Sequence, residues 1–231
     1  MKRQNTLAVV LKRIEYGEAD RIVTVLTPDF GKVHLMVKGA RRQKSKLAEG
    51  IELLSVSEIT FIVGKGELRQ LVSGRLIKHY ASIVRDIDKT MYAYEVLKLI
   101  NRTTEDEADS EYYDLLVTTL EALNNDDIDL NLVRVWFSLH LLQLAGHSPN
   151  LTTDNNGKKL EPGNSYGFEI SDMQFQGNGS YSTNHIKLLR LCISFDSPES
   201  LQKVAKISDL LVDCAYITTN MLNFYIPTDN H

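Results

Sequence analysis

The residues best suited to chemistry form a basic run near the start of the chain. Between Asp29 and Glu49 there are six Lys or Arg residues and no carboxylate, although the whole chain has a net charge of -4. Uncompensated positive charge attracts polyanions such as nucleic-acid phosphates, but a solvated loop that only aids solubility can have the same composition. We predict that the phosphate contacts are made by Lys32, Lys38, Arg41, Arg42, Lys44 and Lys46, with Arg21 and Arg69 as further candidates.

Motifs of the common enzyme active sites do not occur in the sequence. It has no Gly-x4-Gly-Lys-Ser/Thr phosphate loop, no Gly-x-Ser-x-Gly nucleophile elbow, no His-Glu-x-x-His zinc motif and no dinucleotide fingerprint. Asp86 with Asp88, or Asp126, Asp127 and Asp129, could be metal ligands, but carboxylates at expected helix starts more simply face the helix dipole. We therefore expect a protein that is not an enzyme and has no cofactor.

Cys192 and Cys214 lie in separate apolar segments of helical periodicity. Together with six scattered histidines, they do not give four ligands at zinc spacing, so we expect no stoichiometric zinc. We expect buried thiols in a reducing compartment. The apolar run Leu7 to Leu11 is too short for a signal-peptide core or a membrane span, so we expect a cytoplasmic location.

Charge is unevenly divided along the chain. Residues 1–75 have 14 Lys/Arg and 8 Asp/Glu, net +6, whereas the remainder has 12 and 22, net -10. This asymmetry predicts two domains with different partners: a basic domain, residues 1–78, suited to phosphates, and an acidic domain, residues 79–231, suited to packing or to proteins.

The basic domain has the pattern of a β-barrel. Val33, Leu35 and Val37 alternate with His34 and Met36, which is the period of a strand with one buried face. Glycine-bearing turns separate this strand from similar runs. We expect a five-stranded OB-type barrel, with an SH3-like barrel as the alternative, built from residues 6–14, 21–27, 31–38, 51–63 and 68–76.

Aromatic side chains could add base stacking to phosphate binding in such a barrel. OB barrels bind single strands by combining a basic groove with aromatic rings on which bases stack. Tyr16, Phe30 and Phe61 are the candidates here, although each could instead fill an end of the barrel.

From Lys78 onward the apolar period changes from 2 to 3.6, which predicts helices. Asp129 to Ala145 is apolar nearly all round, so this helix should be central, with Gly146 as its C-terminal cap. Ser148 to Tyr181 is rich in Asn, Gly and Thr and predicts a ribbon or small β element. The expected fold class is therefore α+β, with an N-terminal five-stranded OB-type β-barrel followed by an α-helical domain with a small polar β-like insert at 148–181.

Six segments occur in a distinctive order: Tyr16-Gly-Glu-x-Asp20, Gly31-Lys32, Lys38-Gly-Ala-Arg-Arg-x-Lys-Ser45, Phe137-x-Leu-x-Leu-Leu142, Gly146 and Pro149-x-Leu151. Together they resemble the bacterial recombination mediator family RecO. The resemblance implies an OB domain, a helical C-terminal domain, DNA binding and strand annealing, and loading of the RecA recombinase together with RecR. It also implies binding of single-strand-binding protein (SSB) through the acidic tail of that protein.

The sequence departs from the family pattern at two places. Many members have a four-cysteine zinc element after Pro-x-Leu, but there is no cysteine near Asp154, Gly157 or Gly177, and Ser138 stands where a glutamate is usual. We therefore expect hydrogen bonds and packing to hold the insert.

The resemblance also requires the acidic helical domain to accept an acidic peptide tail. A cation beside an apolar pocket suits such a tail. Arg134 could instead pair with Asp129, and His140 could be a hydrogen-bonded structural histidine. The candidate partner-binding residues are Arg134, His140 and Gln143 on the central helix and Lys187 and Arg190 on a later helix.

We therefore expect a non-enzymatic DNA-repair mediator that binds single- and double-stranded DNA, RecR and the SSB tail, acts on RecA indirectly and has no membrane partner. Annealing requires that the phosphate charges of both strands are neutralised while the bases stay free to pair, which suits a diffuse Lys/Arg surface. Two alternatives stay open: a helical interaction adaptor whose barrel docks a protein, and a nuclease or phosphotransferase with dispersed carboxylates.

Overall fold

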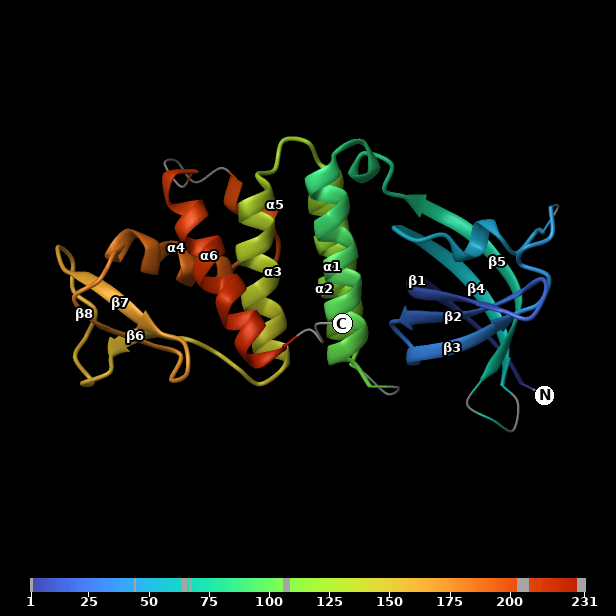
Figure 1. The fold of residues 1–231 in the computed structure, drawn as a ribbon, viewed down its shortest axis with the longest axis horizontal. Helices are drawn as coiled ribbons and strands as arrows, with labels where there is room; N and C mark the ends of the chain where they lie inside the picture. The colour runs from blue at the N-terminus through green and yellow to red at the C-terminus, as the bar shows by residue number, and fades with distance from the viewer. Residues whose placement is uncertain are drawn as a thin grey trace. The chain divides into compact units, whose positions relative to one another are not determined.

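Strands dominate the first part of the chain and helices dominate the rest (Figure 1). The structure, a computed structural model, describes residues 2–43, 45–63, 66, 68–105, 109–202 and 208–227. Two compact units, residues 1–124 and 125–231, are described separately. The first unit contains β1 (Lys2–Tyr16), β2 (Asp20–Thr27), β3 (Gly31–Val37), the 3-10 turn η1 (Glu49–Ile51), β4 (Ser55–Val63), β5 (Arg69–His79), the 3-10 turn η2 (Ile83–Arg85), α1 (Ile87–Thr103) and α2 (Ser110–Asn124).

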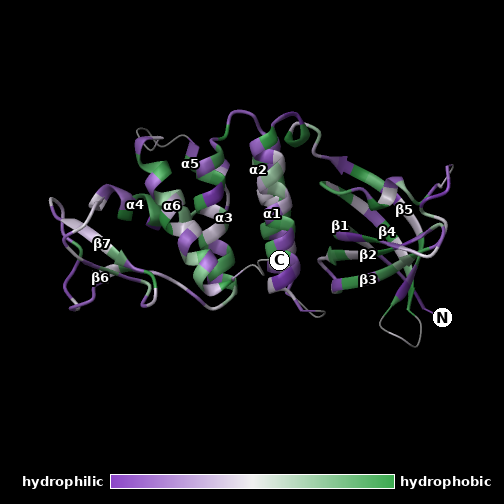
Figure 2. Ribbon diagram, viewed as in Figure 1, coloured by the Kyte–Doolittle hydropathy of each residue, from purple (hydrophilic) through white to green (hydrophobic). Residues whose placement is uncertain are grey.

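The strands of the first unit close into a barrel in the order β1-β2-β3-β5-β4. All neighbours are antiparallel except β3 and β5, which pair in parallel at Leu35↔Arg69 and Met36↔Gln70. This closed Greek-key arrangement confirms the OB-type barrel expected from the sequence. Hydrophobic and hydrophilic residues are mixed along the strands (Figure 2), and along β3 buried and partly exposed residues alternate, as the expected period of 2 requires.

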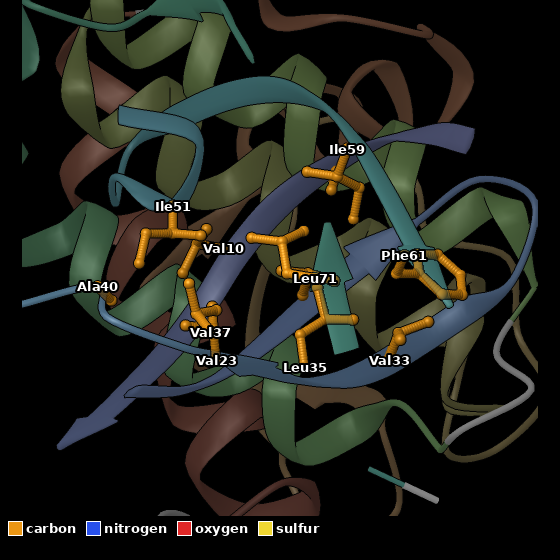
Figure 3. Packing of buried hydrophobic residues seen from close by; sticks show 12 residues of the cluster. Val10, Val23, Val33, Leu35, Val37, Ala40, Ile51, Ile59, Phe61 and Leu71 are labelled. Atoms are coloured by element: carbon orange, nitrogen blue, oxygen red, sulfur yellow. The ribbon is translucent and has the colours of Figure 1, made fainter. Parts of the chain in front are cut away.

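The inward-facing residues fill the barrel. The cluster is dominated by β-branched and leucine side chains whose residues point toward one another, with Ala40 and Ile51 at one end and Phe61 and Val33 at the other (Figure 3). Ala40 and Ile51 belong to the connection between β3 and β4, so this connection contributes to the core. The cluster comprises Ala8, Val10, Val23, Val25, Val33, Leu35, Val37, Ala40, Ile51, Ile59, Phe61 and Leu71.

Helices α1 and α2 complete this unit. Val9, Leu11 and Leu26 are buried but do not belong to the interior cluster, and α1 packs against β1 while α2 packs against β2. The helices therefore cover the outer face of the barrel at these strands. The boundary expected between residues 78 and 79 falls just before the last residue of β5, whereas the compact unit extends to Asn124.

The second unit is built around α3 (Leu130–Leu144), which packs against α4 (Thr183–Ser194) and α6 (Ser208–Tyr225), with the short α5 (Pro198–Gln202) beside it. Val133, Val135 and Phe137 are fully buried, which confirms that this helix is central. Gly146 follows it with a φ of +82°, as a C-terminal cap requires. In the part of the chain that the structure describes, no helix combines the length and the apolar character that crossing a membrane requires.

The expected role of aspartates at helix starts is confirmed for Asp86 and Asp129. Asp86 accepts hydrogen bonds from the backbone N–H of Asp88 and Lys89 at 2.9 and 3.0 Å, and Asp129 accepts one from Asn131 at 2.7 Å. These carboxylates satisfy helix N–H groups that have no partner within the helix.

The polar insert is a small sheet, as expected. It contains β6 (Asn150–Asp154), β7 (Ser165–Glu169), β8 (Gln174–Gly177) and β9 (Tyr181–Ser182) in the order β6-β8-β7-β9. Phe175 is fully buried. The rings of Tyr166, Phe168 and Tyr181 meet its ring edge to face, with distances between ring centres of 6.3, 4.9 and 6.3 Å. The Asp154 carboxylate accepts backbone hydrogen bonds from Asn156 and Lys158, both at 2.9 Å. Aromatic packing and loop hydrogen bonds therefore hold the insert.

The predicted start of one strand is wrong by four residues. The apolar run from Ile51 to Val63 predicted a single strand, but Ile51 ends η1, and β4 begins at Ser55. Leu54 has a φ of +54°, which breaks the extended backbone, and the Ser55 hydroxyl donates to the Glu52 carbonyl at 2.8 Å. Ile51 is apolar because it plugs the barrel end, and it does not extend the ladder.

Candidate nucleic-acid interface

The basic loop, residues 38–48, is fixed to the barrel at both ends. On one side Ala40 is buried in the barrel core, and on the other Ile51 is fully buried. Leu47 packs partly buried against the same core. Because the apolar side chains of this connection point inward, its charged side chains are left at the surface.

Hydrogen bonds tie the start of this loop to the β1–β2 hairpin. The Gly39 N–H donates to the Asp20 carboxylate at 2.7 Å, and the Arg41 N–H donates to the Ala19 carbonyl at 2.9 Å. Gly39 has a φ of +67°, a conformation that favours glycine, so the turn directly after β3 depends on this residue. The hairpin tip and the basic loop are therefore held next to each other.

The far end of the connection is held by a close backbone crossing. A Cβ added to Gly50 would lie 2.5 Å from the Gly74 Cα, so η1 can pack on β5 only because Gly50 has no side chain. Arg13 on β1 donates to the Ile51 carbonyl at 3.3 Å and to the Glu52 carboxylate at 3.1 Å. The chain thus enters and leaves the loop at fixed positions.

Four of the predicted phosphate-binding residues are exposed on this loop: Lys38, Arg41, Arg42 and Lys46. Arg41 also lies 3.4 Å from the Glu15 carboxylate, with 36% of the Arg41 side chain and 64% of that of Glu15 exposed. An ion pair this exposed contributes little, so a phosphate can displace Glu15 at small cost. Lys44 lies outside the described residues.

Two of the other three candidates, Lys32 and Arg69, are engaged elsewhere in the first unit. The Lys32 ammonium donates to the carbonyl oxygens of Asn101, at 3.1 Å, and Thr104, and so binds the C-terminal end of α1. The Arg69 guanidinium lies 5.3 Å from the centre of the Phe61 ring. Arg21 is half-buried on β2. The structure therefore groups the four loop residues and separates Lys32 and Arg69 from them.

The three candidate stacking aromatics also differ. Phe61 is fully buried, and Phe30 packs against the core with its ring edge-on to Phe61 at 5.5 Å. Tyr16, at the last pair of the β1–β2 hairpin, is 53% exposed. Of these rings only Tyr16 can meet a base without unpacking the barrel.

Comparisons with known proteins identify the family. The family model described as "Recombination protein O N terminal" matches residues 1–80, and that described as "Recombination protein O C terminal" matches residues 84–226. The chain belongs to the RecO family.

Individual relatives agree with this assignment. A "DNA repair protein RecO" of Desulfatibacillum aliphaticivorans is 38% identical over 149 residues, which are 63% of this chain and 58% of the relative. One from Dehalococcoides mccartyi is 32% identical over 63% of this chain and 57% of the relative. One from Halalkalibacterium halodurans is 28% identical over 88% of this chain and 74% of the relative. The match thus spans less than two thirds of the first two RecO proteins.

The predicted partner-binding residues in the C-terminal RecO region do not form one surface. Arg134 and Gln143 are nine residues apart on α3, which places them on opposite sides of a helix that turns about 100° per residue. The Arg190 guanidinium donates to the Leu151 carbonyl, at 2.8 Å from Nε, and so joins α4 to β6. Lys187 is exposed on α4.

His140 has a structural setting. Its Nδ1 lies 2.9 Å from the Trp136 carbonyl oxygen and its ring 4.2 Å from the Trp136 ring. Burial lowers the pKa of His140, although the hydrogen bond to Trp136 and the charge of Asp196 act in the opposite direction. A neutral ring stacked on Trp136 stabilises the core and is a weak ligand for an acidic tail.

A Ser-His-Asp arrangement in this unit serves as a helix cap. His185 Nδ1 lies 2.9 Å from the Ser182 hydroxyl, and His185 Nε2 lies 3.2 Å from the Asp213 carboxylate. However, Nδ1 also accepts the Ser182 backbone N–H at 3.0 Å, as part of the capping box that starts α4. The lone pair that would activate the serine is therefore already used.

Metal ligands do not gather in the described part of the chain. Within these residues, no three His, Cys, Asp or Glu side chains lie close enough together to hold a metal ion. Cys192 and Cys214 are buried, and burial raises the pKa of both thiols. Thiols of this kind are poor metal ligands and poor nucleophiles at neutral pH.

Proposed function

We propose that this chain is a DNA-binding mediator of recombinational repair. The observation that carries the proposal is the group of exposed cations Lys38, Arg41, Arg42 and Lys46 on a loop fixed to a closed OB-type barrel. Membership of the RecO family supports the assignment to repair.

The loop suits binding that is independent of sequence. Its exposed groups are guanidinium and ammonium ions, which bind phosphates on either single- or double-stranded DNA. Neutralising the phosphates of two strands lowers their repulsion while the base edges stay free to pair. The chain is therefore proposed to bind both kinds of DNA and to anneal complementary strands without turning over a covalent substrate.

The remaining partners belong to the same proposal. The chain would act with RecR, bind the acidic tail of single-strand-binding protein and help load RecA indirectly. Arg134 and Lys187 are the proposed contacts for the tail carboxylates. A labelled tail peptide titrated against Arg134→Ala and Lys187→Ala should bind less tightly than to wild type. If both variants bind the peptide as tightly as wild type does, the tail binds elsewhere on the chain.

A salt series on the full chain tests DNA binding. Four phosphate contacts predict a slope of log K against log salt of about -2.8 on single strands and about -3.6 on duplex. The same protein should speed the pairing of complementary oligonucleotides without a metal or nucleotide. Absence of binding at low salt, or a slope near zero, would overturn the proposal.

One observation favours the alternative of an interaction adaptor. Along α1, Ile87, Met91 and Tyr94 lie on one face and are 76%, 66% and 48% exposed. Exposed apolar residues at helical spacing are typical of protein-binding surfaces. An adaptor would bind its partner through this face and would show no salt-dependent retention on DNA.

A further inference from the structure

The outer face of the barrel next to the basic loop has an apolar row that crosses three strands. Ile14 on β1 is opposite Ile22 on β2, and Ile22 is opposite Met36 on β3. The neighbours Val23 and Leu35 point into the barrel, so the row faces outward, and Ile14 is 46% exposed. Helices α1 and α2 pack against β1 and β2, where Val9 and Leu26 are fully buried, whereas Ile22 and Met36 are partly exposed.

Tyr16 extends this face toward the basic loop. It is in register with Asp20 at the end of the β1–β2 hairpin and is 53% exposed. The Asp20 carboxylate accepts the Gly39 N–H, so the end of the hairpin that carries Tyr16 is held beside the turn that begins the loop. Lys38, which is exposed, comes directly after Val37, the last residue of β3.

Charge around the row suits a nucleic acid better than an acidic or purely apolar partner surface. Lys12, exposed on β1, flanks one side of the row in register with Thr24, and Lys38 flanks the other. Of the carboxylates on the β1–β2 hairpin, Asp20 accepts the Gly39 N–H and Glu15 lies 3.4 Å from Arg41, whereas Glu18 in the turn is exposed. The face is also continuous with the four exposed cations of the loop.

We propose that Tyr16 is a base-stacking residue that distinguishes single-stranded from double-stranded nucleic acid. Unpaired bases would lie on the Tyr16 ring and on the row Ile14, Ile22 and Met36, while the phosphates contact the basic loop. Single strands expose the faces of their bases, whereas a duplex hides them in its own stack. This inference rests on the proposed function and adds to it the source of strand selectivity.

The test compares three full-length variants by fluorescence anisotropy. Tyr16→Ala should bind a dT oligonucleotide about 5- to 150-fold more weakly, the range expected for loss of one stacked base. Its affinity for a duplex and its salt slopes should stay at the wild-type values, because no phosphate contact is lost. Tyr16→Phe should bind like wild type, and Tyr16→Leu should fall between the two.

An abasic oligonucleotide with the same number of phosphates is the decisive control. Wild type and Tyr16→Ala should bind it equally. If Tyr16→Ala loses the same affinity for the single strand, the duplex and the abasic strand, Tyr16 only shapes the loop. If its affinity for all three is unchanged, the face binds something else, such as a protein. Either result overturns the inference. If wild type shows no salt-dependent DNA binding, the proposed function itself fails.

A fluorescent variant makes the test independent of affinity and of small losses in stability. The native chain has a single tryptophan, Trp136, which is buried, so Tyr16→Trp adds an exposed reporter. A single strand should quench the added emission and the abasic strand should not. Equal quenching by both would contradict stacking.

Discussion

Replacing Lys32 by methionine separates a structural lysine from a phosphate contact. The Lys32 ammonium donates to the carbonyl oxygens of Asn101 and Thr104 at the end of α1. Methionine keeps the apolar stem and removes the charge, leaving these carbonyls without their donor. Hydrogen bonds from charged groups contribute about 1.5 to 3 kcal/mol, and this figure already contains most of the favourable interaction with the helix dipole.

The expected result is a loss of stability without a comparable loss of DNA binding. A change of 1.5 to 3 kcal/mol corresponds to a fall in Tm of roughly 3 to 12 °C for a protein of this size. Circular dichroism melting measures it, and Lys12→Met, which removes an exposed lysine from β1, should leave the Tm within about 2 °C. If Lys32→Met melts like wild type and its single-strand salt slope falls by about 0.7, Lys32 is a phosphate contact and the structural reasoning is wrong.

Three further predictions follow from the packing. A fragment of residues 1–124 should melt cooperatively, whereas residues 1–78 should bind a hydrophobic dye and show no sharp transition, since α1 and α2 cover part of the barrel. Burial raises the pKa of Cys214 to about 12 and that of Cys192 well above its ordinary value, so both thiols should react with Ellman's reagent at about pH 8 only after unfolding. Because burial lowers the pKa of His140, the unfolded chain binds a proton at this residue at a higher pH than the folded chain does. The urea midpoint of unfolding should therefore fall as the pH falls below about 6.5, and His140→Gln should reduce this fall.

Local patterns were enough to predict the fold. The alternation of Val33, Leu35 and Val37 gave β3, and the nearly continuous apolar surface of residues 129–145 gave the central helix α3. These features depend on residues close together in sequence, and a two- or 3.6-residue period records which face is buried.

Contacts between distant residues could not be predicted. The run from Ile51 to Val63 appeared to be one strand, and only the crossing of Gly50 and Gly74 and the left-handed backbone of Leu54 explain why β4 begins later. A pattern of apolar residues cannot distinguish a strand residue from a plug at the barrel end.

The same limitation applies to the candidate site. Charge alone grouped Lys32 and Arg69 with Arg41 and Arg42, but the contact of Lys32 with α1 spans 69 residues of sequence. The Arg69 interaction depends on the ring of Phe61, across a hairpin. Sequence shows that a cation is present, and packing decides whether it faces a phosphate or the protein.

The salt dependence of DNA binding by an Arg41→Ala, Arg42→Ala double variant tests the central claim most directly. Loss of two phosphate contacts should reduce the slope by about 1.4 on single strands and about 1.8 on duplex. The matched control, Lys98→Ala with Arg102→Ala, removes two charges from the end of α1. Lys32 joins this end to the start of β3, roughly 20 Å from where the loop begins and beyond the Debye length of about 8 to 10 Å. We predict a wild-type slope for the control; an unchanged slope for the Arg41, Arg42 variant, or equal reductions in both, would contradict the assignment of the basic loop as the DNA contact.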